Sequence, residues 1–91
     1  MKVLVVDDDP KIAAYLKSLL TRMECEAMVA GTGDEAMQVF EKQPADLVLL
    51  DLFLPDCRGD ELIPEFRRRW PDVQVITMTG YNSEELERAV R

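Results

Sequence analysis

Histidine is absent from this chain of 91 residues, and cysteine occurs only twice, at Cys25 and Cys57. The two cysteines form no Cys-x-x-Cys pair and have no histidine partners, so neither a zinc site nor a disulfide framework is indicated. Such cysteine usage favours a reducing, cytoplasmic setting. A metal bound by this chain is expected to have oxygen ligands, which suit a hard ion such as Mg²⁺.

Basic residues are scarce as well. Lysine and arginine number 11 against 18 aspartates and glutamates, which gives a formal net charge of -7. This charge argues against nucleic acid and anionic membranes as direct partners, because both are negatively charged and bind positively charged protein surfaces. The only basic run, residues 67–69, is spread around a helix axis and is expected to face solvent. No apolar stretch is long enough for a membrane span or for the core of a signal peptide.

Repeats, low-complexity segments and linkers are also missing, and the length allows one domain only, residues 1–91. Hydrophobic residues make up 47% of the chain and charged residues 32%, a composition typical of globular rather than disordered proteins. The sequence therefore predicts a small folded domain with a modest core.

Strand and helix patterns alternate along the chain. Strands are expected at residues 2–6, 24–30, 47–50 and 73–78, and helices at residues 10–23, 34–42, 61–69 and from residue 83 onward. Strand-helix units in series predict an α/β fold with a parallel sheet covered on both faces. Asp9 is expected to cap the first helix with Pro10 at its first position, Asp60 to cap the third, and Asn82 to open a capping box for the last. Pro64, early in the third helix, must forfeit one backbone hydrogen bond.

Apolar residues recur at helical spacing in all four predicted helices, and these are expected to face the sheet. They are Ile12, Leu16, Leu19, Leu20 and Met23 in the first helix, Ala36, Val39 and Phe40 in the second, Leu62, Ile63 and Phe66 in the third, and Leu86, Ala89 and Val90 in the last.

Acidic residues follow two of the predicted strands. Strand 2–6 runs directly into Asp7, Asp8 and Asp9, and the four apolar residues of strand 47–50 are followed by Asp51. Since parallel strands end at the same edge of a sheet, these carboxylates are expected to gather there, and their mutual repulsion would be relieved by a cation, with Mg²⁺ the first choice. For Asp9 helix capping is the favoured role, and a helix cap or a solvated loop acid is the simpler alternative for Asp51.

Three short motifs occur in order, each at the end of a predicted strand: Val-Asp7-Asp8-Asp9-Pro, then Leu-Asp51-Leu-Phe-Leu-Pro55 with Gly59 four residues later, then Met-Thr79-Gly80-Tyr81. In this arrangement the whole chain resembles the receiver domain of two-component response regulators. The resemblance implies a flavodoxin-like, three-layer fold with strand order 2-1-3-4.

The resemblance also implies a function, that of a signalling module rather than an enzyme. Asp51 would take a phosphoryl group from a histidine kinase, a phosphotransfer protein or a small acyl phosphate. Asp8 and Asp51 would bind Mg²⁺ directly, Asp7 partly through water, and Phe53 through its backbone carbonyl. Thr79 would hydrogen-bond the phosphoryl oxygens, with Gly80 leaving room for them.

The sequence departs from the family pattern at its end, where a fifth strand with a lysine and a fifth helix usually follow. We therefore expect weakened phosphorylation, because a charge-assisted hydrogen bond of this kind is worth about 1.5–3 kcal/mol. We also expect an exposed fourth strand, residues 73–78, that favours self-association. The main alternative is a truncated receiver scaffold that self-associates without being phosphorylated. A haloacid-dehalogenase-type phosphatase would need an acid where Phe53 stands, and a flavodoxin-like cofactor binder would not place three aspartates in its phosphate loop.

Overall fold

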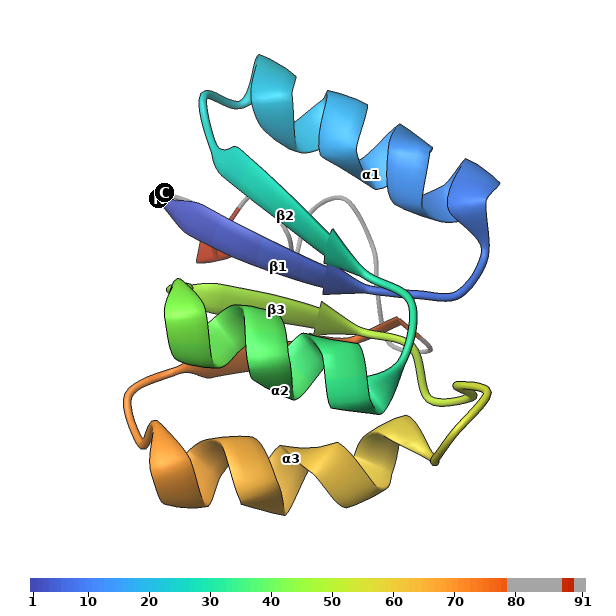
Figure 1. The fold of residues 1–91 in the computed structure, drawn as a ribbon. Helices are drawn as coiled ribbons and strands as arrows, with labels where there is room; N and C mark the ends of the chain where they lie inside the picture. Colours follow the sequence, from blue (N-terminus) through green and yellow to red (C-terminus); the bar gives the residue numbers. More distant parts are fainter. Residues whose placement is uncertain (79–87, 90–91) are drawn as a thin grey trace.

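The computed structural model describes residues 1–78 and 88–89, in which strands and helices alternate (Figure 1). The elements are β1 (Lys2–Val6), α1 (Pro10–Arg22), β2 (Glu26–Ala30), α2 (Gly33–Lys42), β3 (Leu47–Leu50), α3 (Gly59–Arg69) and β4 (Gln74–Thr77). The four strands form one parallel sheet in the order β2-β1-β3-β4, which confirms the predicted topology. None of the helices within the described ranges is long and apolar enough to cross a bilayer.

The sheet is the middle layer, with α1 on one face and α2 and α3 on the other (Figure 1). Alternate residues of β1 and β3 divide between two core clusters. Val3 and Val5 point to the α1 face, where Ala89 also packs. Leu4 and Val6 point to the face of α2 and α3. Both central strands are thus buried on both faces, as expected for strands of a parallel sheet.

The register aligns the carboxyl ends of the strands. Val6 pairs with Leu50, and Leu50 pairs with Thr77. The residues that follow these pairs must therefore leave the sheet at the same edge. For β1 and β3 those residues are Asp7 and Asp51.

The first helix begins as the sequence predicts. Pro10 is its first residue, and the Asp9 carboxylate accepts a hydrogen bond of 2.9 Å from the Lys11 amide. Leu16 and Leu20 are buried, and Leu19 and Met23 are partly buried. The expectation for Ile12 is wrong, because its side chain is 43% exposed. Ile12 lies at the edge of the apolar stripe, whose centre runs through Ala13, Leu16 and Leu20.

The second strand begins two residues later than predicted, at Glu26, because the chain turns sharply at Glu24. Glu24 has a φ of 62°, in the left-handed region, and closes α1 with a 3.0 Å hydrogen bond from its amide to the Thr21 carbonyl. A residue with a Cβ pays a conformational cost there that glycine does not.

A Glu24→Gly variant is therefore expected to gain about 0.5–1 kcal/mol in its free energy of unfolding. Urea unfolding would measure the gain. The matched control is Glu26→Gly, which places glycine at the exposed first position of β2 and should lose up to about the same amount. A loss of stability in Glu24→Gly would contradict this account of the turn.

The third helix corrects the prediction that Asp60 is its cap. The helix starts at Gly59, and Arg58 occupies the cap position, but its side chain makes no capping hydrogen bond to the helix backbone. The Gly59 amide donates to the Leu52 carbonyl at 2.8 Å, which turns the chain into the helix two residues earlier than a cap at Asp60 implies. Asp60 lies within the first turn and forms an ion pair of 3.1 Å with Arg58. The helix runs through Pro64 without a break, as expected.

The remaining helical predictions agree with the structure wherever they can be compared. In α2, which starts one residue earlier than predicted, Ala36 and Phe40 are buried, and in α3 Phe66 is buried with Leu62 and Ile63 packed beside it. β4 is shorter by one residue at each end than the predicted strand 73–78. The predicted capping box at Asn82 and the inward positions of Leu86 and Val90 lie outside the described residues.

Candidate functional site

The acids that follow β1 and β3 come together at the carboxyl edge of the sheet. The Asp7 amide donates to the Ala30 carbonyl at 3.0 Å and the Asp51 amide to the Val6 carbonyl at 2.9 Å, which continues the ladder beyond the strands. One carboxylate oxygen each from Asp7, Asp8 and Asp51 lies within 4.8 Å of the other two. The predicted meeting of these three side chains at one edge is therefore confirmed.

The three carboxylates differ in exposure, and only Asp7 is buried, with 5% of its surface accessible. Asp51 is half-buried and Asp8 is exposed. Burial raises the pKa of Asp7 above its ordinary value of 3.8, and repulsion from the Asp51, Asp8 and Asp9 carboxylates raises it further, against a hydrogen bond from the Asp9 amide that lowers it. The folded protein thus holds negative charge at a place where water solvates it poorly.

The donor set fits a hard divalent cation. All three side chains offer oxygen, and an octahedral Mg²⁺ holds its ligands about 3–4 Å apart, so small side-chain rotations would bring this group onto one ion. Asp8, the exposed member, leaves the cluster open to solvent, where the water ligands that Mg²⁺ retains can be accommodated. A bound cation would also remove the repulsion that raises the pKa of Asp7.

The segment of residues 51–58 that follows β3 is folded back on itself. Phe53 and Arg58 form an isolated antiparallel bridge, and the Leu54 amide donates to the Cys57 carbonyl at 3.1 Å. The Phe53 amide donates to the Asp51 carboxylate at 3.1 Å, and Arg58 occupies the cap position of the next helix, α3, so Asp51 is not a helix cap. The Phe53 ring is 67% exposed and carries the Arg58 guanidinium 5.6 Å from its centroid.

Gly59 packs against the backbone of Asp51, a contact that the sequence pattern did not reveal. A Cβ added at Gly59 would lie 2.1 Å from the carbonyl oxygen of Asp51 and 2.9 Å from the Cα of Leu52. Only glycine lets the first turn of α3 approach the backbone of Asp51 this closely. A glycine after a proline-closed loop was the available signal, but sequence alone does not show what the glycine touches.

Asp9 lies beside the cluster but serves α1, as predicted, because its carboxylate accepts the Lys11 amide. Thr79 and Gly80, the residues expected to contact a phosphoryl group, lie outside the described residues.

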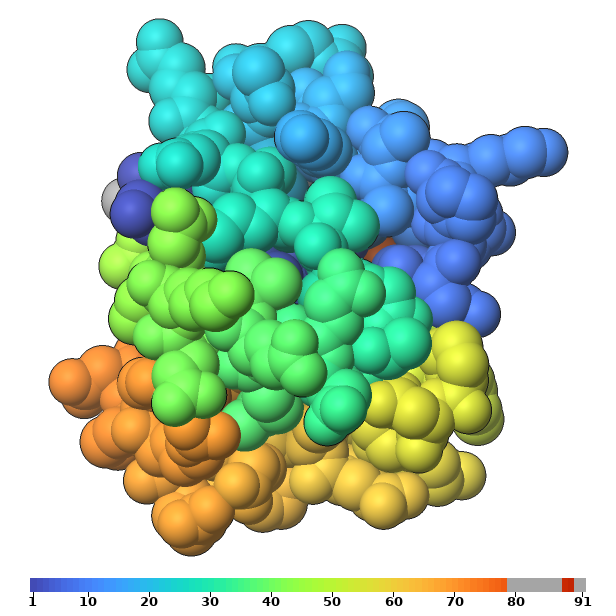
Figure 2. Space-filling view, viewed as in Figure 1, coloured from blue at the N-terminus to red at the C-terminus, as the bar shows by residue number. Residues whose placement is uncertain are grey.

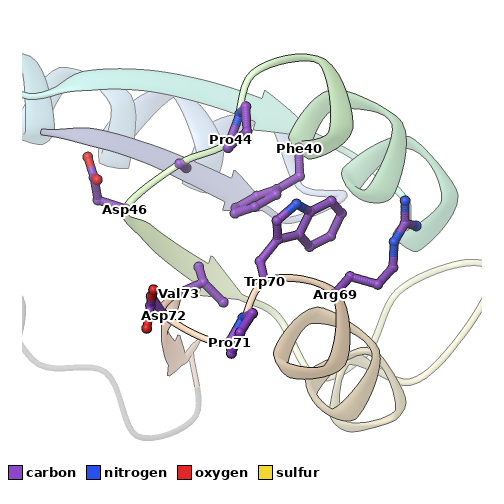
Figure 3. Close-up of a pocket in the computed structure, with 9 residues that line it drawn as sticks. Phe40, Pro44, Asp46, Arg69, Trp70, Pro71, Asp72 and Val73 are labelled. Carbon is purple, nitrogen blue, oxygen red and sulfur yellow. The ribbon is translucent and has the colours of Figure 1, made fainter.

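A pocket of about 400 Å³ lies at the opposite edge of the sheet (Figure 3). Phe40 and Trp70 contribute aromatic walls, and Asp46 and Val73 line it just before β3 and β4 begin. Asp46 precedes β3, and Asp51 follows the other end of the same strand, so this pocket lies away from the acidic cluster and takes no part in it.

A parallel sheet in the order β2-β1-β3-β4, with a carboxylate cluster at its carboxyl edge, defines a flavodoxin-like α/β domain with a candidate divalent-cation site. The family model described as the response regulator receiver domain matches residues 3–91, and the chain belongs to this family. The resemblance seen in the three sequence motifs is thereby confirmed.

Relatives and solved structures agree with this membership. The chain is 42% identical over 82 residues to the sensory transduction protein RegX3 of Mycolicibacterium smegmatis, covering 90% of this chain and 36% of RegX3. It is 34% identical over 79 residues to the regulatory protein LuxO of Vibrio cholerae, covering 87% of this chain and 17% of LuxO. The chain thus spans only a minor part of these curated relatives.

Two solved structures share the fold at higher coverage. A CheY-like receiver domain protein from Methanospirillum hungatei has a TM-score of 0.83 and 33% identity, covering 97% of this chain and 70% of that chain. The response regulator protein TrrA from Thermotoga maritima, in complex with Mg(2+)-BeF, has a TM-score of 0.79 and 33% identity, covering 97% of this chain and 76% of that chain.

Proposed function

We propose that this domain is the phosphoacceptor of a two-component system and takes a phosphoryl group onto Asp51 in a Mg²⁺-dependent reaction. The donor is the phosphohistidine of a histidine kinase or of a phosphotransfer protein, and a small acyl phosphate can replace it. The observation that carries the proposal is the position of the Asp51 carboxylate beside those of Asp7 and Asp8 at the carboxyl edge of the sheet. The domain acts as a cytoplasmic signalling module rather than as an enzyme. Its net charge of -7 disfavours direct binding to nucleic acid.

The resemblance to receiver domains suggests how the residues divide the work. Asp8 and Asp51 would hold Mg²⁺ directly, Asp7 partly through water, and Phe53 through its backbone carbonyl. When bound, Mg²⁺ supplies positive charge that offsets the charge developing on the phosphoryl oxygens. A carboxylate needs no general base to act as a nucleophile, so a short domain can provide the acceptor. Phosphoryl transfer needs little more than positioning and charge stabilisation.

In the transfer, one oxygen–phosphorus bond forms and one phosphorus–nitrogen bond breaks. The Asp51 Oδ1 atom accepts the Phe53 amide hydrogen bond, which fixes the orientation of the carboxylate. One carboxylate oxygen of Asp51 forms a bond to phosphorus while the bond from phosphorus to the donor's imidazole nitrogen breaks, and the nitrogen keeps the electron pair. Thr79, outside the described residues, is proposed to hydrogen-bond the transferred group. The complex of TrrA with Mg(2+)-BeF supports the choice of metal.

The proposal is tested by incubating the domain with acetyl phosphate and Mg²⁺ and measuring its intact mass. We expect a gain of one phosphoryl group that is absent from Asp51→Asn and from samples treated with a chelator. Asp46→Asn, which changes an exposed acid at the opposite edge of the sheet, serves as the control and should gain the group as the natural chain does. An unmodified natural chain, or equal modification of Asp51→Asn, would contradict the proposal.

Self-association through β4 is a second proposed property. Among the described strands β4 pairs only with β3, so within residues 1–78 one of its edges has no strand partner. The strand carries Val75 and Ile76 and contains no proline, features of an edge that pairs with other strands. Sedimentation velocity over a range of concentrations should show a monomer-dimer equilibrium. A compact monomer at millimolar concentration would rule this property out.

A further inference from the structure

The loop of residues 51–58 is attached to α2 through the carboxylate of Asp56. Asp56 Oδ1 accepts the Gly33 amide at 2.9 Å, and Asp56 Oδ2 accepts the Asp34 amide at 3.0 Å. These amides belong to the first turn of α2, where backbone N–H groups have no partner within the helix. Both oxygens of one carboxylate thus bind a segment 22 or 23 residues away in sequence.

Charge keeps this attachment in place. The hydrogen bonds from Gly33 and Asp34 hold the pKa of Asp56 below its ordinary value of 3.8, so the carboxylate is ionised at neutral pH. An anion at a helix N-terminus is further favoured by the helix dipole.

Close packing reinforces the hydrogen bonds. A Cβ added at Gly33 would lie 2.5 Å from the Cys57 sulfur and 3.1 Å from a methyl group of Leu62. Asp56 and Cys57, the tip of the loop, therefore lie directly on the start of α2. Figure 2 shows the yellow loop beside the green helix. Burial raises the pKa of the Cys57 thiol, so it packs there in its neutral form.

A series of hydrogen bonds connects the tip of the loop to the acidic cluster. The Leu54 amide donates to the Cys57 carbonyl at 3.1 Å, which closes the loop next to Asp56. Phe53 comes next toward the site, and its amide donates to the Asp51 carboxylate at 3.1 Å. At the base, the Gly59 amide donates to the Leu52 carbonyl at 2.8 Å. A displacement of Asp56 and Cys57 would therefore also move the backbone of Phe53 and the side chain of Asp51.

We propose that Asp56 is a positioning residue: by binding two amides of α2, its carboxylate holds residues 51–54 in the geometry that metal binding and phosphoryl transfer require. The inference rests on the proposed function, and it assigns to Asp56 a role that none of the three sequence motifs suggested. Asp56 is not a member of the acidic cluster, and in this proposal it acts only through Phe53 and Asp51.

Simple helix capping is the competing explanation, and the chain contains a matched control for it. Thr32 caps the same end of α2, where its hydroxyl oxygen accepts the Glu35 amide at 3.0 Å. Thr32→Ala and Asp56→Ala both remove cap interactions from one helix, but only Asp56→Ala releases the loop. The two variants are expected to show similar decreases in melting temperature.

The experiment compares both variants with the natural chain by NMR. Titration with Mg²⁺, followed at the Asp51 and Phe53 amides, should show about tenfold weaker binding for Asp56→Ala, the effect typical of losing a group that orients a metal ligand. Thr32→Ala should bind within about twofold of the natural chain. Hydrogen exchange at the Phe53 and Leu54 amides, measured without metal, should be about tenfold faster in Asp56→Ala alone.

Equal Mg²⁺ affinities for the two variants, or equal exchange rates at Phe53 and Leu54, would reduce Asp56 to a helix cap and overturn the inference. The exchange rates need no metal, so they decide this point separately from the proposed function. If the natural chain binds no Mg²⁺ and takes no phosphoryl group, the proposed function fails, whereas faster exchange in Asp56→Ala alone would still support control of the loop by Asp56.

Discussion

A Gly59→Ala variant should lose about 3 kcal/mol of unfolding free energy, at the upper end of the cost of overpacking, and should bind Mg²⁺ poorly as well. The added methyl group would lie 2.1 Å from the Asp51 carbonyl oxygen and 2.9 Å from the Cα of Leu52. Both are backbone atoms, so rotating a side chain cannot relieve the clash. Either α3 must move away from the sheet or the segment after β3 must move, and the second response displaces Asp51.

The chain provides a control for this effect at Gly31, where an added Cβ would meet no atom within 4 Å. Gly31→Ala should change stability by less than about 0.5 kcal/mol and leave Mg²⁺ binding intact. Urea unfolding with and without Mg²⁺ measures both quantities for the two variants. If Gly59→Ala unfolds and responds to Mg²⁺ as Gly31→Ala does, the close approach of α3 to Asp51 is not what shapes the site.

An Asp7→Asn variant is expected to change stability in opposite directions with and without metal. Without metal, it should be more stable than the natural chain by about 1 kcal/mol, the repulsion between two unit charges about 4 Å apart even in water. With Mg²⁺, it should bind about 10–100-fold more weakly, as when an outer ligand of a metal site is lost. Excess Mg²⁺ should therefore stabilise the natural chain and leave the variant nearly unchanged.

The pH dependence of this difference follows from the raised pKa of Asp7. At pH well below the ordinary value of 3.8, Asp7 is protonated in both the folded and the unfolded chain, and the variant has no advantage. As the pH rises through the raised pKa, the unfolded chain releases its proton more readily than the folded one, so the natural chain loses stability relative to Asp7→Asn. Above that pKa the difference is constant.

Unfolding free energies at several pH values without metal, taken as the difference between the natural chain and Asp7→Asn, would measure this dependence. Asp72→Asn, at an exposed position remote from the cluster, controls for a general loss of negative charge. A difference that is independent of pH, or a metal-free variant less stable than the natural chain, would contradict the electrostatic account of Asp7.

The acidic cluster could be predicted from the sequence because it depends on two simple rules. Apolar runs of strand length mark β1 and β3, and parallel strands place the residues that follow them at one edge. The pairing of Val6 with Leu50 then brings Asp7 and Asp51 together. No knowledge of side-chain packing was needed for this step.

The parts that sequence reasoning missed depend on contacts between distant segments. Asp56 binds amides of Gly33 and Asp34, and nothing in the local pattern around Asp56 points to α2. The start of α3 was misplaced for a similar reason. Asp60 is a good cap by residue type, but the hydrogen bond from Gly59 to Leu52 fixes the earlier start. Ile12 follows the helical period, yet it lies at the edge of the face that meets the sheet and is exposed.

The central claim is that Asp7, Asp8 and Asp51 bind one divalent cation, and Mn²⁺ used as a paramagnetic substitute for Mg²⁺ tests it most directly. At substoichiometric Mn²⁺, the NMR amide signals of Asp8, Asp51 and Phe53 should broaden first, and excess Mg²⁺ should restore them. Signals from Asp46 and Asp72 at the opposite edge of the sheet should stay sharp. Broadening that begins at Asp46 and Asp72, or that spreads evenly over the acidic surface, would contradict the claim.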